Sequence, residues 1–194
     1  MKKTTLIIIS AVVALVAVYC ISTYNSLAKA EQEVASAWSN VETQYQRRSD
    51  LIPNLVNTVK GYATHETQAL ESVVAARAAA TSVTIDGSNM SAEQMAQFVE
   101  AQNGVTSALG KLIAVAESYP DLKANQNFLE LQAQLEGTEN RIAVERQRYN
   151  EGAKGFNQRI VTFPANMIAN AFGFSKKEFF AAQAEAHTAP VVNF

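Results

Sequence analysis

One uncharged apolar stretch near the N-terminus limits the possible folds of this chain more than any other feature. The residues from Leu6 to Ile21 carry no charge. Their extension to Tyr24 gives about 20 residues, roughly the length of a helix that crosses the hydrocarbon core of a bilayer. We predict a transmembrane anchor over residues 1–26. The apolar residues that would contact lipid are Leu6, Ile7, Val12, Leu15, Val18 and Ile21.

Two other interpretations of this stretch stay open. Residues 28–30 (Ala-Lys-Ala) have the small-x-small form of a signal-peptidase site, so the stretch could be a signal peptide cleaved after Ala30. Against cleavage, the apolar run is longer than a usual signal core, and no turn residue precedes the site. A lipoprotein signal ending at Cys20 is disfavoured because Tyr19 occupies a position where a small residue is expected. We favour the uncleaved anchor.

The charges that flank the stretch predict its orientation. Lys2 and Lys3 precede it, whereas the far side opens with the mixed charges of Lys29, Glu31 and Glu33. Because cytoplasmic flanks carry an excess of lysine and arginine, we expect the N-terminus in the cytoplasm and the remaining domain outside it.

Composition narrows the class of the remaining domain. The 194 residues include 48% hydrophobic residues but only 8 Gly and 4 Pro, which favours helices over a turn-rich β-sandwich or barrel. The net charge of -2 gives no electrostatic support for nucleic-acid binding. Cys20 is the single cysteine, so the chain can form neither an internal disulfide nor a cysteine zinc site.

Apolar residues beyond the anchor recur at helical spacing, which predicts that the anchor and the first helix of the domain are continuous. This first stripe comprises Leu27, Val34, Trp38, Val41 and Tyr45. Residues 47–53 (Arg-Arg-Ser-Asp-Leu-Ile-Pro) predict a break. There Ser49 or Asp50 would cap a second helix that holds Pro53 in its first turn and runs to about Thr81, a length of roughly 40 Å.

Two further long helices and two short ones follow. Residues 81–89 read as a loop, and Ser91 with Gln94 forms the capping box of a third helix. Residues 119–121 end it and begin a fourth helix, which Phe163 and Pro164 stop. A short helix over 165–171 ends at Gly173, and Ser175 is expected to cap a last one. The fourth stripe comprises Phe128, Leu131, Leu135, Ile142, Tyr149, Phe156, Ile160 and Phe163.

The predicted fold class is therefore all-α. Helices of this kind, joined by short connections, form an antiparallel four-helix bundle of long helices. We expect the bundle domain over residues 27–181 and a C-terminal tail over 182–194.

The sequence offers little site chemistry. His65 and His187 are the two histidines and lack the spacing of a zinc motif, and the Glu-x-x-His pairs of bundle di-iron sites are missing. We predict no catalytic, cofactor-binding or metal-binding residues. Arg47 and Arg48 beside Asp50 form either a pair across a helix junction or an exposed surface pair, and Glu139 is expected on a solvated flank.

The most suggestive surface feature is a cluster of aromatic residues near the C-terminus. It either caps the open end of the bundle or docks to a membrane or another subunit. The tail ends in apolar residues that strand-addition grooves can bind, or it is disordered. The candidate partner-binding residues are Phe172, Phe174, Phe179, Phe180, Val192 and Phe194.

Several long motifs resemble those of the LemA family. They are residues 47–56 (RRSDLIPNLV), 59–63 (VKGYA), 65–66 (HE) and 119–125 (YPDLKAN), followed by Phe128, Leu131, Gln132, Leu135, Glu139, Arg141, Ile142, Arg146, Tyr149, Asn150, Phe163, Pro164, Gly173, Phe174, Phe179 and Phe180. Phe156 departs from the family's frequent tyrosine and loses a hydroxyl. The resemblance covers nearly the whole chain. It implies a single-pass protein of the bacterial inner membrane with a long-helix bundle, and it implies no catalytic residues.

These observations favour a membrane-anchored helical scaffold that assembles with itself or with other membrane proteins, without catalysis. Its expected partners are membrane lipid through the N-terminal helix and further copies of the chain, with another membrane protein as the alternative partner. The alternative is an adaptor or regulator of a membrane protease or envelope-stress system, with the tail and residues 47–54 as candidate contacts. An enzyme is the least supported hypothesis, because no nucleophile pairs with a base at the polar corners 47–54 and 119–125.

Overall fold

The computed structural model describes residues 2–85, 87 and 90–181, and all regular secondary structure in this part of the chain is helical. This confirms the predicted all-α class and the bundle arrangement. The helices are α1 (Lys2–Lys60), α2 (Thr67–Ser82), α3 (Ala92–Ala116), α4 (Pro120–Lys123), α5 (Gln126–Val161) and α6 (Ala165–Phe172).

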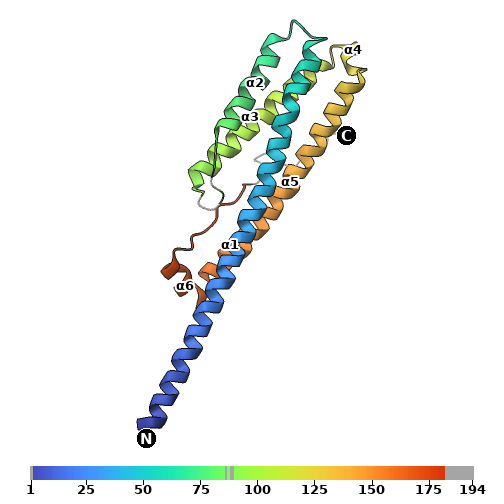
Figure 1. Cartoon of the computed structure of the whole chain (residues 1–194). Coiled ribbons are helices and arrows are strands. Elements are labelled where there is room, and N and C mark those ends of the chain that lie inside the picture. The colour runs from blue at the N-terminus through green and yellow to red at the C-terminus, as the bar shows by residue number, and fades with distance from the viewer. Residues whose placement is uncertain (1, 86, 88–89, 182–194) are drawn as a thin grey trace, which may run out of the picture.

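Helix α1 spans the whole length of the molecule. Its 59 residues give a rod of roughly 88 Å, and α5 packs beside its upper two thirds (Figure 1). The α2–α3 hairpin covers the upper end. Below the bundle, α1 projects alone, and its large aliphatic side chains from Leu6 to Ile21 are exposed. Leu27 is the first large residue of α1 that is buried in the domain.

The predicted break at residues 47–53 is wrong, because α1 continues through Pro53 to Lys60. A proline inside a helix has no N–H for the carbonyl four residues earlier, which here belongs to Ser49. Arg77 of α2 supplies the missing donor, since its Nε lies 2.9 Å from the Ser49 carbonyl oxygen. Ser49 and Asp50 therefore cap no helix.

Helix α2 is accordingly shorter than predicted. It begins at Thr67 rather than near residue 50, and its 16 residues give roughly 24 Å in place of 40 Å. Residues 61–66 form the turn between α1 and α2. The expected loop after α2 is confirmed for the described residues between Ser82 and Ser91.

The start of α3 follows the prediction, whereas the start of α5 does not. At α3 the Gln94 N–H donates to Ser91 Oγ at 3.2 Å, and the Ser91 N–H donates to Gln94 Oε1 at 2.9 Å, which completes the capping box. Pro120 begins only the four-residue α4. The long helix starts at Gln126 instead, because Asn125 Oδ1 accepts from the Phe128 N–H at 3.0 Å.

The predicted last helix after Ser175 is also wrong. Helix α6 ends as expected at Gly173, whose φ of 79° suits glycine. Residues 174–181, which we call the strap, then run back along the bundle without helical structure. Two asparagines of α5 replace the helical hydrogen bonds. Asn157 exchanges two bonds of 2.8 Å with the Lys177 backbone, and Asn150 exchanges two of 2.9 Å with the Phe180 backbone.

Two hydrophobic cores lie one above the other along the bundle. The proximal core, nearer the projecting segment, comprises Leu27, Ala30, Val34, Trp38, Val41, Tyr45, Met90, Met95, Phe98, Ile142, Tyr149, Ala153, Phe156, Ile160, Ile168, Ala169 and Phe180. The distal core comprises Ile52, Leu55, Val59, Ala63, Leu70, Val73, Ala80, Val105, Ala108, Leu109, Leu112, Ala116, Leu122, Phe128 and Leu135. Helices α1, α3 and α5 contribute to both cores.

The role of Arg77 can be tested with a double-mutant cycle. Arg77→Met leaves the Ser49 carbonyl without a donor, so we expect the free energy of unfolding to fall by about 1–3 kcal/mol. In a Pro53→Ala background the new backbone N–H can donate to Ser49, and Arg77→Met should then cost clearly less. Chemical unfolding in detergent, followed by circular dichroism, measures both. An equal cost in the two backgrounds would show that Arg77 does not compensate for Pro53.

Candidate functional site

A polar layer separates the two cores at mid-height of the bundle. Its members are Arg48 of α1, Gln102 and Thr106 of α3, and Glu139 of α5. Arg48 lies on the apolar stripe of α1, between Tyr45 of the proximal core and Ile52 of the distal core. Arg48 and Gln102 thus occupy buried positions where helix packing would otherwise place apolar residues, whereas Thr106 and Glu139 reach them from the edge of the layer.

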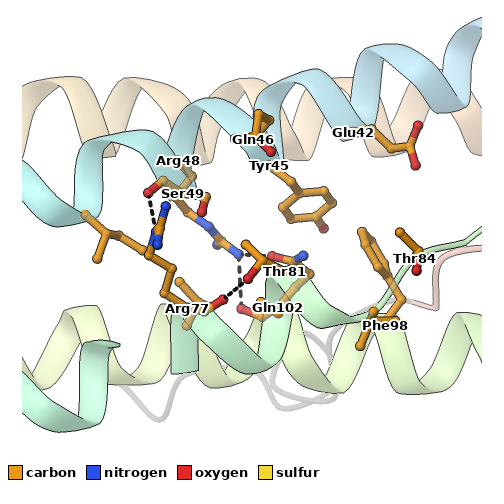
Figure 2. A pocket seen from close by; sticks show the side chains of 14 residues that line it. Glu42, Tyr45, Gln46, Arg48, Ser49, Arg77, Thr81, Thr84, Phe98 and Gln102 are labelled. Carbon is orange, nitrogen blue, oxygen red and sulfur yellow. Dashed lines mark hydrogen bonds between the residues drawn. The ribbon is translucent and has the colours of Figure 1, made fainter. Parts of the chain in front are cut away.

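Arg48 is the centre of this layer and is only 2% exposed. Its Nη1 donates to Glu139 Oε1 at 2.6 Å and to Thr106 Oγ1 at 2.9 Å. Its Nη2 donates to Gln102 Oε1 at 2.6 Å and to the Gln102 carbonyl at 3.2 Å (Figure 2). The planar guanidinium therefore joins α1 to α3 and α5 in one fixed register. Glu139 keeps 37% of its side chain exposed, so water still solvates part of the counter-charge.

A cavity of about 180 Å³ lies beside Arg48, between α1, α2 and α3 (Figure 2). Tyr45 and Phe98 form one wall, with ring centroids 5.1 Å apart in an edge-to-face arrangement. Burial raises the pKa of the Tyr45 hydroxyl, and the nearby charges of Arg146 and Arg48 oppose that rise. Among the described residues that line the cavity there is no histidine, cysteine or lysine. The charged residues that line it are Glu42, Arg48 and Arg77, and the other lining residues are polar or apolar.

The strap closes the proximal core with an aromatic cluster. Phe180 stacks on Trp38 with centroids 5.6 Å apart and an interplanar angle of 13°, and Tyr149 meets Trp38 edge-on at 5.4 Å. The Tyr149 hydroxyl donates to the Glu178 carbonyl at 3.0 Å. Burial, together with the Glu178 charge, raises the pKa of Tyr149 to about 12, so the hydroxyl keeps its proton as a donor. Arg146 covers the outer face of Phe180 at 4.6 Å.

The candidate partner-binding residues divide into two groups. Phe180 is buried in the proximal core, and Phe174 is partly buried between Tyr24 and Phe156. Phe172 and Phe179 are exposed. Val192 and Phe194 lie outside the described residues. A role in partner binding stays a prediction for all six, and of the four placed ones only Phe172 and Phe179 are exposed enough to contact a partner directly.

Sequence reasoning missed two ion pairs, each between a buried cation and a partly exposed carboxylate. Glu139 pairs with Arg48 instead of lying on a solvated flank, while Arg47 is exposed and Asp50 accepts from Gln46 Nε2 at 2.7 Å. Arg48 lies three residues after Tyr45 and four residues before Ile52, and this helical spacing is the sequence signal that Arg48 is buried. Lys177 of the strap, nearly fully buried, donates to Glu31 Oε1 at 2.6 Å and lies 5.4 Å from the Phe156 ring.

No cluster of three potential metal ligands occurs among the described residues. The histidine that the sequence singled out, His65, lies in the turn after α1 and is exposed. The structure thus brings together no candidate metal centre in the part of the chain that it describes.

Comparison with known proteins gives a consistent assignment. The model of the LemA family matches residues 37–194. Magnetosome proteins MamQ 1 and MamQ 2 of Paramagnetospirillum magneticum are each 28% identical over 174 residues, which cover 81% of this chain and 64% of the relative. Protein LemA of Metamycoplasma hominis is 26% identical over 145 residues, 75% of this chain and 63% of that protein. The chain therefore spans less than two thirds of the length of these relatives.

The importance of the polar layer can be tested by removing one charge and then both. Glu139→Leu leaves the Arg48 charge buried without its partner, so we expect a loss of about 3 kcal/mol, the low end for a broken buried pair because Glu139 is partly solvated. The double variant Arg48→Met/Glu139→Leu should be more stable than Glu139→Leu, since no unpaired charge remains. Glu136→Leu, on the exposed face of α5, is the control and should change stability by less than about 0.5 kcal/mol. A double variant no more stable than Glu139→Leu would contradict this account.

Proposed function

This chain belongs to the LemA family, and from that membership and its structure we propose that it is a single-pass, membrane-anchored helical scaffold that assembles with itself or with other membrane proteins. The proposal assigns it a mechanical role rather than a catalytic one. The family match begins at residue 37, so it does not include the apolar N-terminal segment, and support for an anchor comes from the chain itself.

The continuity of α1 is the observation that carries the proposal. One helix contains both an exposed apolar segment, long and apolar enough to cross a membrane, and the buried stripe of the bundle. No glycine interrupts it, and Arg77 compensates for its only proline. A helix of this kind transmits the position of the membrane segment to the bundle without a flexible linker, as a scaffold requires.

Packing around residue 30 favours an anchor that is kept. Leu27 and Ala30 are both buried in the proximal core, and Ser26 Oγ lies 3.5 Å from Arg159 Nη1 of α5. Cleavage after Ala30 would remove Leu27 and its contacts from the folded domain. The apolar segment is therefore better explained as a permanent transmembrane helix than as a signal peptide.

The flanking charges support one orientation for this helix. Lys2 and Lys3 precede the apolar segment, and the opposite flank has no net positive charge across Lys29, Glu31 and Glu33. We therefore place the N-terminus in the cytoplasm and the bundle on the periplasmic or extracellular side.

The polar residues of the bundle support a role without catalysis. Arg48, Gln102 and Glu139 hydrogen-bond to one another, and Arg77 bonds to the backbone of α1. These four side chains thus hold the helices together. We therefore look for the function of the protein on its outer surfaces.

The surface around Phe179 is the best candidate for assembly. The exposed Phe179 ring borders a hollow of about 450 Å³ between the strap and the start of α3. Ala92, Met95, Ala96 and Val99 form its apolar floor. An exposed aromatic ring beside an apolar hollow is the arrangement in which two copies can exchange rings across a two-fold axis.

Mass measurement of the full chain in mild detergent tests this assembly. We expect the wild-type protein to exceed the mass of one protomer, and Phe179→Ser to shift it toward the monomer, because the variant loses the ring that enters the hollow. Leu129→Ser is the matched control, an exposed apolar residue near the opposite end of α5, and should keep the wild-type mass. Light scattering coupled to size exclusion gives the three masses. A wild-type monomer at every concentration would contradict self-assembly.

A further inference from the structure

The bundle leaves several large apolar side chains uncovered at helix α6 and just before it. Ile168 and Ala169 point into the proximal core. On the outside, Phe163 is 76% exposed, Met167 63% and Phe172 62%. Phe163 continues the α5 stripe in sequence, yet the turn at Pro164 leaves it outside the core. These three exposed residues, one just before α6, one in its first turn and one at its end, are here called the α6 face.

The stretch that contains α6 carries no charge. From Ile160 to Ser175 every residue is uncharged, although charged residues are frequent elsewhere in the bundle. Arg159 immediately precedes this stretch and Lys176 immediately follows it, and both side chains are exposed. An uncharged apolar segment between two exposed cations is typical of a helix that lies in the interface of a membrane with anionic lipids.

The α6 face lies at the level where α1 would leave the membrane. The Phe172 ring contacts Tyr24 of α1, with centroids 4.9 Å apart, and Cys20 packs against the proximal core beside α6. About 20 helical residues after Lys3, the roughly 30 Å of a hydrocarbon core end near Tyr24. Figure 1 shows α6 beside α1 where the helix leaves the bundle and projects alone.

We propose that α6 is a second membrane contact, which inserts its apolar face into the headgroup region around the exit of α1 while Arg159 and Lys176 face lipid phosphates. This inference rests on the proposed transmembrane role of α1. A second contact beside the first would fix both the tilt and the rotation of the bundle, which one helix passing through a fluid bilayer cannot do alone.

Lipid fits the α6 face better than a second copy of the chain. Helix α6 has eight residues and is roughly 12 Å long. Each partner of a stable protein interface contributes about 800 Å², far more than one face of so short a helix offers. Phe172 of the face also contacts Tyr24 of α1, which follows the exposed apolar segment that we propose to cross the membrane.

Depth-dependent quenching in vesicles tests the proposal. A polarity-sensitive fluorophore is attached at Met167→Cys in the full chain with Cys20→Ala, and the protein is inserted into phosphatidylethanolamine–phosphatidylglycerol vesicles. Lipids with a nitroxide near the headgroup or near the chain end serve as quenchers. We expect a large loss of emission with the shallow quencher and a smaller loss with the deep one. Leu129→Cys, exposed near the far end of α5, is the matched control and should lose little emission with either.

A third label separates this inference from the proposed function. Val12→Cys lies in the middle of the apolar segment and should be quenched more strongly by the deep nitroxide. If Val12 is quenched while Met167 behaves like Leu129, the anchor stands and the α6 contact is overturned. If Val12 is not quenched, the transmembrane anchor fails, and the α6 contact fails with it. Strong shallow quenching at Met167, with none at Leu129, would support the second contact.

Discussion

The shape of this protein depends on two arginines, one that replaces the backbone donor missing at a proline of α1 and one that joins α1 to its neighbouring helices. The exposed Pro53 lacks a backbone N–H, and Arg77 replaces that donor at the carbonyl of the buried Ser49. Arg48, the residue before Ser49, joins α1 to Gln102 on α3 and to Glu139 on α5. Because an unpaired buried carbonyl or charge is costly, Arg77 favours the continuous helix over a broken one, and Arg48 holds that helix against α3 and α5.

A continuous α1 connects the remaining elements to its apolar N-terminal segment. Helix α5 follows α1 from the distal core to Arg159, and the strap is fastened to α5 by Asn150 and Asn157. The strap in turn places Phe180 on Trp38 and Lys177 against Glu31, both on the proximal half of α1. The proximal core is therefore closed around the helix that carries the projecting segment.

The sequence predicted the fold class and most of the helix stripes, and it failed where tertiary partners override local signals. Arg48, Ile52, Leu55 and Val59 continue the three-and-four spacing of α1 without interruption, but Pro53 suggested a break. No local pattern reveals that Arg77, on another helix, supplies the missing donor. Likewise, Ser175 resembles a helix cap, yet the amides of Asn150 and Asn157 bind the backbone of Phe180 and Lys177 in a non-helical strap. The sequence places Glu139 on an expected solvated flank, so its ion pair with the buried Arg48 is not predicted.

The distance between two spin labels on α1 tests the central claim most directly. Asn25→Cys and Asn57→Cys are exposed positions on either side of Pro53, and Cys20→Ala removes the native thiol. A continuous helix separates them by about 48 Å, because each residue adds 1.5 Å. Double electron–electron resonance on the full chain in lipid should therefore give one narrow distribution near that distance. A broad or clearly shorter distribution, as a break at residues 47–53 would produce, would contradict the account.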